Sequence, residues 1–122
     1  MIQFKRFQIK ENETEKINKK INFPIKNLDL KKYLKKYEKN EKKINDFKYD
    51  LYAVCFHEGN INSGHYFSKI LVGDDWYLFD DDFVCRVDED SLINENSYLL
   101  FYRQNKKSKK QKNKNKKYKY KK

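Results

Sequence analysis

The hydrophobic residues of this chain fall in short runs with a period of two, which is typical of β-strands. The clearest alternation covers residues 49–56, which read Tyr-Asp-Leu-Tyr-Ala-Val-Cys-Phe. Both faces of this segment are partly apolar. The pattern therefore predicts a strand at the centre of a sheet, with neighbours on both sides.

Several other segments favour strands because they alternate or are rich in β-branched and aromatic residues. They are residues 1–9, 66–72, 76–79, 83–87 and 97–103, with a short edge strand at 21–24 that ends at Pro24. Gly73, Asp74 and Asp75 predict a hairpin turn between two of them. Residues 28–37 and 88–93 favour short helical turns, the second with Asp88 or Asp90 as its cap. Residues 8–20 and 57–64 are expected to be loops, and 35–48 a charged connector.

These elements predict an α+β fold that is mostly an antiparallel β-sheet. About six strands are expected, within the usual range of sheet sizes. The chain has 122 residues, enough for one small domain. The predicted sheet is apolar on both faces, but the sequence predicts few helices to cover them. Part of the layer that normally covers such a sheet is therefore not predicted from this chain.

Charge divides the chain into a neutral body and a basic tail. The chain carries 29 Lys+Arg and 18 Asp+Glu, and eleven of the lysines lie in residues 105–122, which contain no acidic residue. Residues 1–104 are therefore formally neutral. The tail has no aliphatic residue and is expected to be disordered. It is either a plain solvated segment or a nuclear-import signal or nucleic-acid-binding arm.

The two cysteines, Cys55 and Cys85, do not form a disulfide framework, and no apolar signal segment precedes them. We therefore expect an intracellular protein of the cytoplasm, the nucleus or both. No apolar run is long enough to span a membrane, so no membrane partner is expected.

The candidate chemistry lies in Gly64-His65-Tyr66 and in Asp80-Asp81, fifteen positions beyond the histidine. A hairpin folded at residues 73–75 places Asp80 opposite residue 67 or 68, roughly 7–10 Å along the strand from His65. A diagonal reach or a bulge closes that gap. A histidine base oriented by a carboxylate is two thirds of a nucleophilic triad. On this pattern alone, His65 is equally well a structural histidine.

Two metal sites are weaker alternatives. A zinc site would use both cysteines and both histidines of the chain, Cys55, His57, His65 and Cys85, but Cys-x-His is not a usual zinc spacing. The aspartates at 74–75 and 80–82 lack the spacing of a calcium loop. We therefore expect no bound metal and no cofactor.

Several runs together resemble the C-terminal part of a ubiquitin-specific protease domain, the papain-like deubiquitinase family, and cover residues 1–104. The runs are Phe4-Lys5-Arg6-Phe7, then Lys20-Ile21-Asn22-Phe23-Pro24 with Leu28-Asp29-Leu30, a histidine box from Tyr49 to Tyr66, Trp76-Tyr77 with Phe79-Asp80-Asp81, and Tyr98-Leu99-Leu100-Phe101-Tyr102. The histidine box is the most specific of them.

The resemblance implies roles for individual residues. His65 matches the catalytic general base and Asp80 the acid that orients it. Gly64, Tyr66 and Asp81 match positions beside the substrate. The fold implied is the palm part of the protease domain, and the implied partner is ubiquitin or a ubiquitinated protein. Residues 8–19 and 57–64 match loops that border the channel for the ubiquitin tail.

The chain departs from the family pattern because it has no cysteine box, and neither Cys55 nor Cys85 matches the nucleophile. The resemblance therefore implies a deubiquitinase fragment with the catalytic histidine and aspartate, inactive alone and completed by a cysteine-box segment upstream. The alternatives are a non-catalytic relic that binds ubiquitin or another partner, and a nucleic-acid-binding protein that acts through its tail.

Overall fold

The computed structural model describes residues 1–33 and 47–105 of the chain, which divide between two compact units. The first unit comprises Met1–Phe23 and Leu51–Tyr102, and the second comprises Pro24–Asp50 and Arg103–Lys122. The predicted disordered tail, apart from Asn105, and most of the predicted connector lie outside the described residues.

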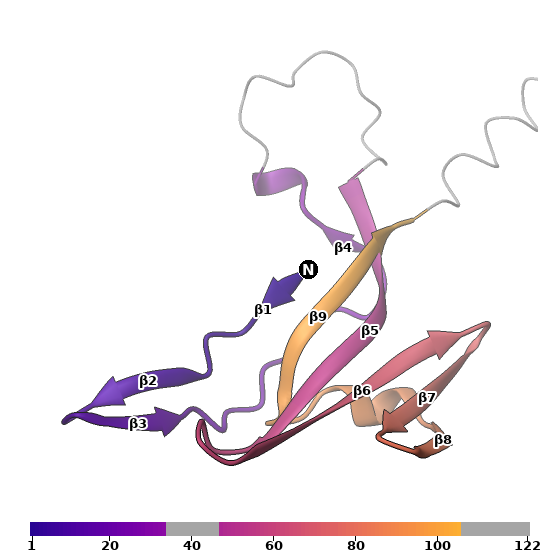
Figure 1. Ribbon diagram of the computed structural model, residues 1–122. Coiled ribbons are helices and arrows are strands. Elements are labelled where there is room, and N and C mark those ends of the chain that lie inside the picture. The colour runs from indigo at the N-terminus through magenta and orange to yellow at the C-terminus, as the bar shows by residue number, and fades with distance from the viewer. Residues whose placement is uncertain (34–46, 106–122) are drawn as a thin grey trace, which may run out of the picture. The chain divides into compact units, whose positions relative to one another are not determined.

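The first unit is built on a twisted sheet with the strand order β1-β9-β5-β6-β7-β8 (Figure 1). The strands are β1 (Ile2–Gln3), β5 (Lys48–Gly59), β6 (Gly64–Val72), β7 (Asp75–Asp80), β8 (Phe83–Val87) and β9 (Ser97–Gln104). The pairs β1–β9, β5–β6, β6–β7 and β7–β8 are antiparallel. The mostly antiparallel fold and the central position of β5 are thus as predicted.

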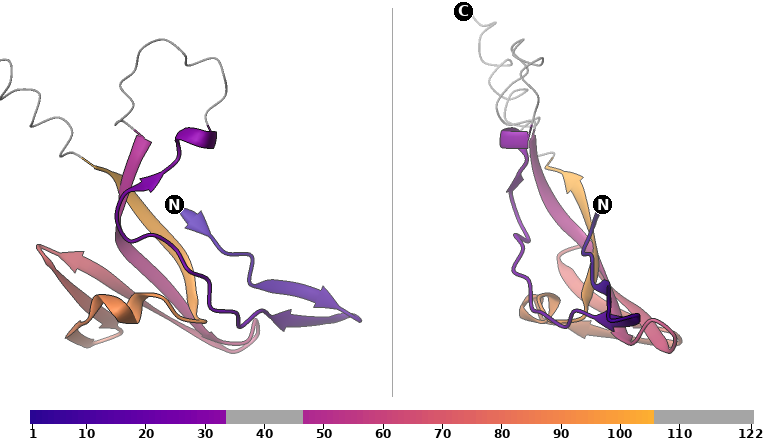
Figure 2. Two further views of the ribbon diagram at one scale, coloured as in Figure 1. Left: turned by 180° about the vertical axis from the view of Figure 1, so that it is seen from behind. Right: turned by 90° about the vertical axis from the view of Figure 1, so that its left-hand side faces the viewer.

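A short 3-10 helix covers part of the sheet. This helix, η4 (Glu89–Leu92), lies beside the β6–β8 strands (Figure 2) and buries Leu92 completely. The Lys69 ammonium on β6 donates to the carbonyl oxygen of Ser91 at 2.8 Å. The same ammonium lies 4.7 Å from the ring centroid of Phe56, whose side chain is fully buried. Asp88 occupies the predicted cap position, but its side chain makes no cap hydrogen bond.

The N-terminal segment corrects one prediction, because residues 1–9 do not form one strand. Pairing with β9 ends at Gln3, and the next strand, β2 (Phe7–Lys10), starts four residues later in a separate two-stranded sheet. The break falls where the Arg6 side chain turns into the protein, with only 1% of its surface exposed. A continuous strand would leave this guanidinium without the three carbonyl groups that it binds.

A second correction concerns the predicted loop at residues 8–20. Most of it is the hairpin of β2 with β3 (Glu13–Lys16), which is antiparallel with Lys10 opposite Glu13. The two turn residues, Glu11 and Asn12, have φ values of 50° and 67°. Two positive φ values match the type I′ turn that two-residue hairpins favour.

The second unit contains β4 (Leu28–Asp29), which pairs antiparallel with the start of β5, and a short 3-10 helix, η1 (Lys31–Tyr33). The helical turns predicted from residue 28 are therefore wrong at their beginning, and residues 34–37 lie outside the described part. The edge strand predicted at residues 21–24 is also wrong, because these residues form no ladder.

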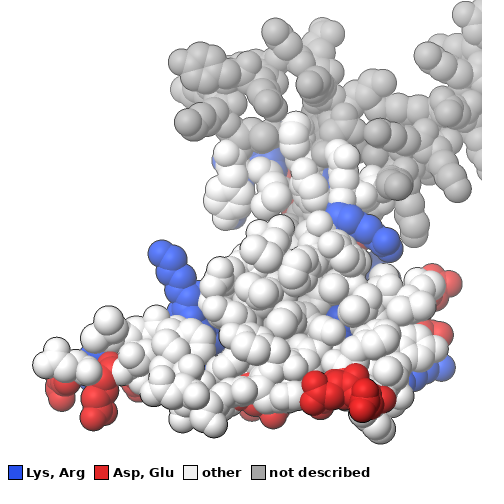
Figure 3. Space-filling view, viewed as in Figure 1, with Lys and Arg blue, Asp and Glu red and all other residues white. Residues whose placement is uncertain are grey.

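The described residues show no continuous basic surface on the face in Figure 3, where basic and acidic side chains form small separate groups. In residues 1–33 and 47–105, no helix has both the length and the hydrophobicity to cross a bilayer.

Candidate functional site

The site begins at a tight loop between β5 and β6. The ladder extends to the pair Gly59–Gly64, so the loop is residues 60–63 and not the predicted 57–64. The Asn60 side chain accepts backbone N–H bonds from Asn62 at 3.0 Å and Ser63 at 2.8 Å. Gly59 has φ +90°, and a Cβ there would lie 2.4 Å from the Ser63 carbonyl oxygen. Glycine is therefore required where the loop leaves β5.

The structure brings His65 and Asp80 together. Their side chains form a hydrogen bond of 2.5 Å between His65 Nε2 and Asp80 Oδ1. The β6–β7 register pairs Ser68 with Phe79, which puts Asp80 level with Phe67. The aspartate thus reaches the histidine along the diagonal of the ladder, one of the two routes expected from the sequence.

The electrostatics of His65 follow from this contact. The hydrogen bond to Asp80 raises the pKa of the imidazole above its ordinary 6.5 and is the largest cause of the shift. Desolvation lowers the pKa, and the negative charges of Asp80, Asp81 and Glu58 raise it. The two side chains are 47% and 38% exposed. Because Asp80 takes Nε2, Nδ1 is the ring nitrogen left to exchange a proton with a reacting group.

Asp81 lies beside this pair at the β7–β8 turn, which also contains Asp82. Its φ of 48° is unusual for a residue other than glycine and marks a locally strained backbone. One ligand atom from each of His65, Asp80 and Asp81 lies within 4.8 Å of the other two, close enough to hold a metal ion. Because Nε2 is bonded to Asp80, a cation would have to displace that contact.

The zinc set considered from the sequence is not assembled. Within the described residues, His65, Asp80 and Asp81 are the single group with metal-binding spacing, and it includes neither cysteine. Burial raises the pKa of the Cys55 thiol, which disfavours the thiolate. Cys85 is a free, half-buried thiol on β8.

Gly64 and Tyr66 flank the histidine on the opposite face of β6. Tyr66 is 55% exposed, and its ring centroid lies 4.7 Å from that of His57 on β5. Gly64 packs directly against the His57 ring. The sequence reasoning considered His57 only as a metal ligand, and the glycine seven residues later was the available signal for a close contact.

Two basic residues that the sequence reasoning missed support this region. The Arg6 guanidinium donates to the carbonyl oxygens of Ser97 at 2.7 Å and of Ile17 and Lys19 at 2.8 Å. The Lys16 ammonium donates to the carbonyl oxygen of His57 and, at 3.2 Å, to Oδ1 of Asn96. These bonds attach the β2–β3 hairpin to β5 and to the segment before β9.

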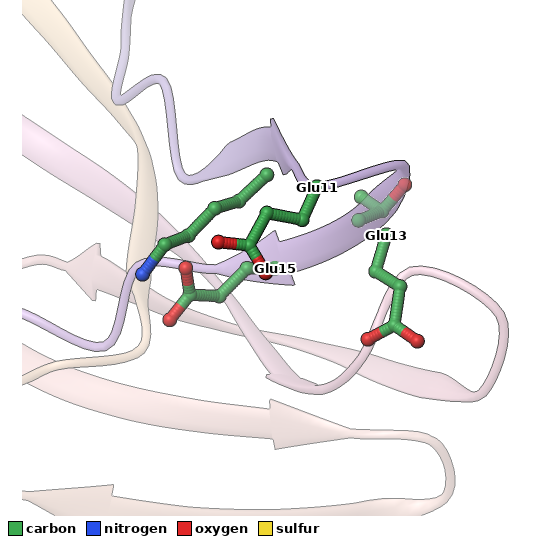
Figure 4. Close-up of a pocket in the computed structure, with 5 residues that line it drawn as sticks. Glu11, Glu13 and Glu15 are labelled. Atoms are coloured by element: carbon green, nitrogen blue, oxygen red, sulfur yellow. The ribbon is translucent and has the colours of Figure 1, made fainter.

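A hollow of about 530 Å³ lies on the β2–β3 hairpin, away from this chemistry (Figure 4). Its lining residues are Lys10, Glu11, Glu13, Thr14 and Glu15. Neither His65 nor Asp80 lines it, so the hollow is separate from the candidate site.

Comparison with known proteins gives a consistent family. The sequence model described as ubiquitin carboxyl-terminal hydrolase matches residues 1–102. Ubiquitin carboxyl-terminal hydrolase 9 of Arabidopsis thaliana is 40% identical over 102 residues, which are 82% of this chain and 11% of the relative. Ubiquitin carboxyl-terminal hydrolase 19 of Homo sapiens is 36% identical over 85% of this chain and 8% of the relative.

Solved structures show the same likeness. A chain of the SAGA Ubp8/Sgf11/Sus1/Sgf73 DUB module bound to ubiquitin aldehyde superposes with a TM-score of 0.71 and 30% identity, covering 85% of this chain and 24% of that one. A chain of the yeast SAGA DUB module gives a TM-score of 0.70 at 29% identity over 85% of this chain and 22% of its own. The chain therefore spans about a tenth of the curated relatives and about a quarter of these solved chains.

Proposed function

The chain belongs to the ubiquitin carboxyl-terminal hydrolase family, and we propose that it carries the histidine–aspartate half of a cysteine-type deubiquitinase active site. His65 is the general base and Asp80 orients it. The 2.5 Å bond between His65 Nε2 and Asp80 Oδ1 carries this proposal. Residues 1–104 are then the C-terminal portion of a catalytic domain, and residues 105–122 are a separate tail.

The remaining ring nitrogen performs the proton transfers. His65 Nδ1 takes the proton of a cysteine thiol supplied by a cysteine-box segment that is not among these 122 residues. The thiolate attacks the carbonyl carbon of the last glycine of ubiquitin. The imidazolium returns the proton to the leaving amine as the C–N bond breaks, and water then cleaves the thioester with His65 again as base. Asp80 stabilises the imidazolium.

Ubiquitin is the proposed partner, since one similar solved chain belongs to a module bound to ubiquitin aldehyde. Tyr66 follows His65 in the chain and offers an exposed aromatic surface on the opposite face of β6, where a bound partner can pack. Gly64 leaves the backbone accessible beside it, and Asp81 adds a second carboxylate next to Asp80. We assign these three residues to substrate binding.

A binding relic without catalysis explains the exposed Tyr66 but not the His65–Asp80 bond. Binding alone does not require a carboxylate that orients the His65 imidazole through one ring nitrogen. It also does not require the other nitrogen to be left available. The catalytic proposal accounts for both features, so we prefer it.

The proposal is tested by joining an upstream cysteine-box segment to the chain, fused or in trans, and measuring cleavage of a fluorogenic ubiquitin substrate. Activity that requires the added cysteine, His65 and Asp80 is the expected result. Ubiquitin binding with no cleavage in any combination would favour the binding relic.

A further inference from the structure

The start of β6 is held from both of its faces. Asp80 reaches His65 along a diagonal of the β6–β7 ladder. His57 pairs with Tyr66 in the β5–β6 ladder, and its ring extends along the corresponding diagonal to Gly64. Because side chains alternate between faces, the contact at Gly64 lies opposite to the one at His65.

The contact at Gly64 is unusually close. A Cβ on Gly64 would lie 2.2 Å from Nε2 and 2.8 Å from Cε1 of the His57 ring, and 2.9 Å from the carbonyl oxygen of Glu58. No real Cβ sits at such distances, so the ring occupies the volume that any other residue would need. The space taken by the His57 ring thus explains why the residue before His65 is a glycine.

The His57 ring has little freedom to move. It is 3% exposed and packs against Phe7 of β2, Tyr66 of β6 and Tyr98 of β9, with centroid distances of 5.3, 4.7 and 6.2 Å. The Lys16 ammonium of β3 donates to the backbone carbonyl oxygen of His57. Aromatic rings from three other strands therefore restrict the His57 ring.

The ring is also kept neutral. Burial lowers the pKa of His57 below its ordinary value, and the positive charge of Lys16 lowers it further. Its Nδ1 is buried without a hydrogen-bond partner in the described part of the chain. Burial of a polar atom without a partner is unfavourable, so a purely apolar residue would serve better if His57 only filled space.

We propose that His57 is a positioning residue, which holds the backbone at Gly64 so that His65 meets Asp80. This inference rests on the proposed role of His65 as general base, and it names His57 as the residue that supports His65 in position. His57 touches neither substrate nor the reacting atoms in this account. It acts through one glycine on the opposite face of the strand.

The test is a pH titration of both imidazole rings by NMR in the full chain, which has two histidines and so gives two assignable signals. In His57→Ala, we expect the pKa of His65 to fall towards its ordinary value, because Gly64 loses its support and the bond to Asp80 loosens. His57→Gln should shift it in the same direction by less. Gly64→Ala should push the His57 ring outward and displace the backbone at residue 64, so it should also lower the pKa of His65 towards its ordinary value.

Leu100→Ala is the matched control, since this 1% exposed side chain lies on β9 and loss of its buried volume destabilises the fold generally. It should leave the pKa of His65 unchanged. If His57→Ala does not fold, His57→Gln and Gly64→Ala decide the matter. An unchanged His65 pKa in both of these variants would overturn the inference.

The proposed function fails differently. If the pKa of His65 is not raised in the unsubstituted chain, the His65–Asp80 pair itself is absent. If the pKa of His65 is raised in the unsubstituted chain but does not change in the His57 and Gly64 variants, the His65–Asp80 pair is present and His57 does not position it.

Discussion

At the scale of single residues, the site depends on the hydrogen bond between His65 and Asp80, in which the His65 imidazole titrates. The pKa of His65 is raised in the folded chain, first by its hydrogen bond to Asp80. The stabilisation from this pair is therefore fully present below the ordinary pKa of 6.5 and is lost as the pH rises through the folded value. The raised pKa makes the imidazole a stronger base.

Replacing Asp80 should lower the pKa of His65. Asp80→Asn keeps the shape and an acceptor oxygen but removes the charge, so NMR titration should show His65 closer to 6.5. Asp75→Asn on the same strand is the control, because Asp75 pairs with Arg86 at 2.7 Å and does not touch His65. Equal shifts in the two variants would show a general field effect in place of the specific bond.

Arg6 should be the most costly basic residue to remove among those described here. Arg6→Ala leaves the carbonyl groups of Ser97, Ile17 and Lys19 without their donor, and we expect a loss of about 3 kcal/mol in the free energy of unfolding. Lys5→Ala, at the exposed neighbouring position, should change it by less than about 0.5 kcal/mol. Urea unfolding measures both. Similar midpoints for the two variants would contradict the structural role of Arg6.

At the scale of elements, the strands with an apolar face could be predicted from the sequence. The segments that became β5 to β9 alternate clearly, and Gly73 marks the β6–β7 turn, so their order and the diagonal approach of Asp80 to His65 followed from local patterns. The β2–β3 hairpin could not be predicted in this way. Its second strand, Glu13–Lys16, is polar throughout, and its turn has Glu11 and Asn12 with positive φ where glycine is the usual signal.

Long-range contacts explain the other errors. Arg6 falls on the face that Ile2 and Phe4 make apolar, and its partners include a residue 91 positions away. His57 reads as a loop residue because nothing in the local pattern shows that β5 continues to Gly59. Buried polar residues of this kind are satisfied by distant backbone groups, which no local period reveals.

The two glycines with positive φ should differ in their cost of substitution. Gly73→Ala meets no atom within 4 Å, so its cost is the left-handed backbone alone, about 1 kcal/mol. Gly59→Ala adds a collision with the carbonyl oxygen of Ser63 and should cost clearly more. Unfolding in urea ranks the variants, and Gly73→Asn should recover part of the loss because asparagine tolerates this conformation. Equal costs for the two alanine variants would contradict the described loop.

At the scale of the molecule, the chain matches a small part of its relatives. It spans 11% of the Arabidopsis relative and about a quarter of the solved chains. Within that part, the structure contains the hydrogen-bonded pair of His65 and Asp80, while burial raises the pKa of the Cys55 thiol. The proposed activity therefore requires chemistry that these 122 residues do not supply.

The chain by itself should not cleave a ubiquitin C-terminal ester or amide. His65 has no thiol to activate, so the purified chain should give the background rate with a fluorogenic ubiquitin substrate. Turnover that is abolished by Cys55→Ala or Cys85→Ala would show that one of these cysteines is the nucleophile. The proposal that a separate cysteine-box segment supplies the nucleophile would then be wrong.

The most direct test of the central claim is the kcat/KM of the chain reconstituted with a cysteine-box segment, compared with its His65→Ala variant. We expect the substitution to reduce turnover by roughly a hundredfold to ten-thousandfold, with Asp80→Asn reducing it less and removal of residues 105–122 leaving it unchanged. A reconstituted enzyme that keeps full activity without His65 would contradict the account.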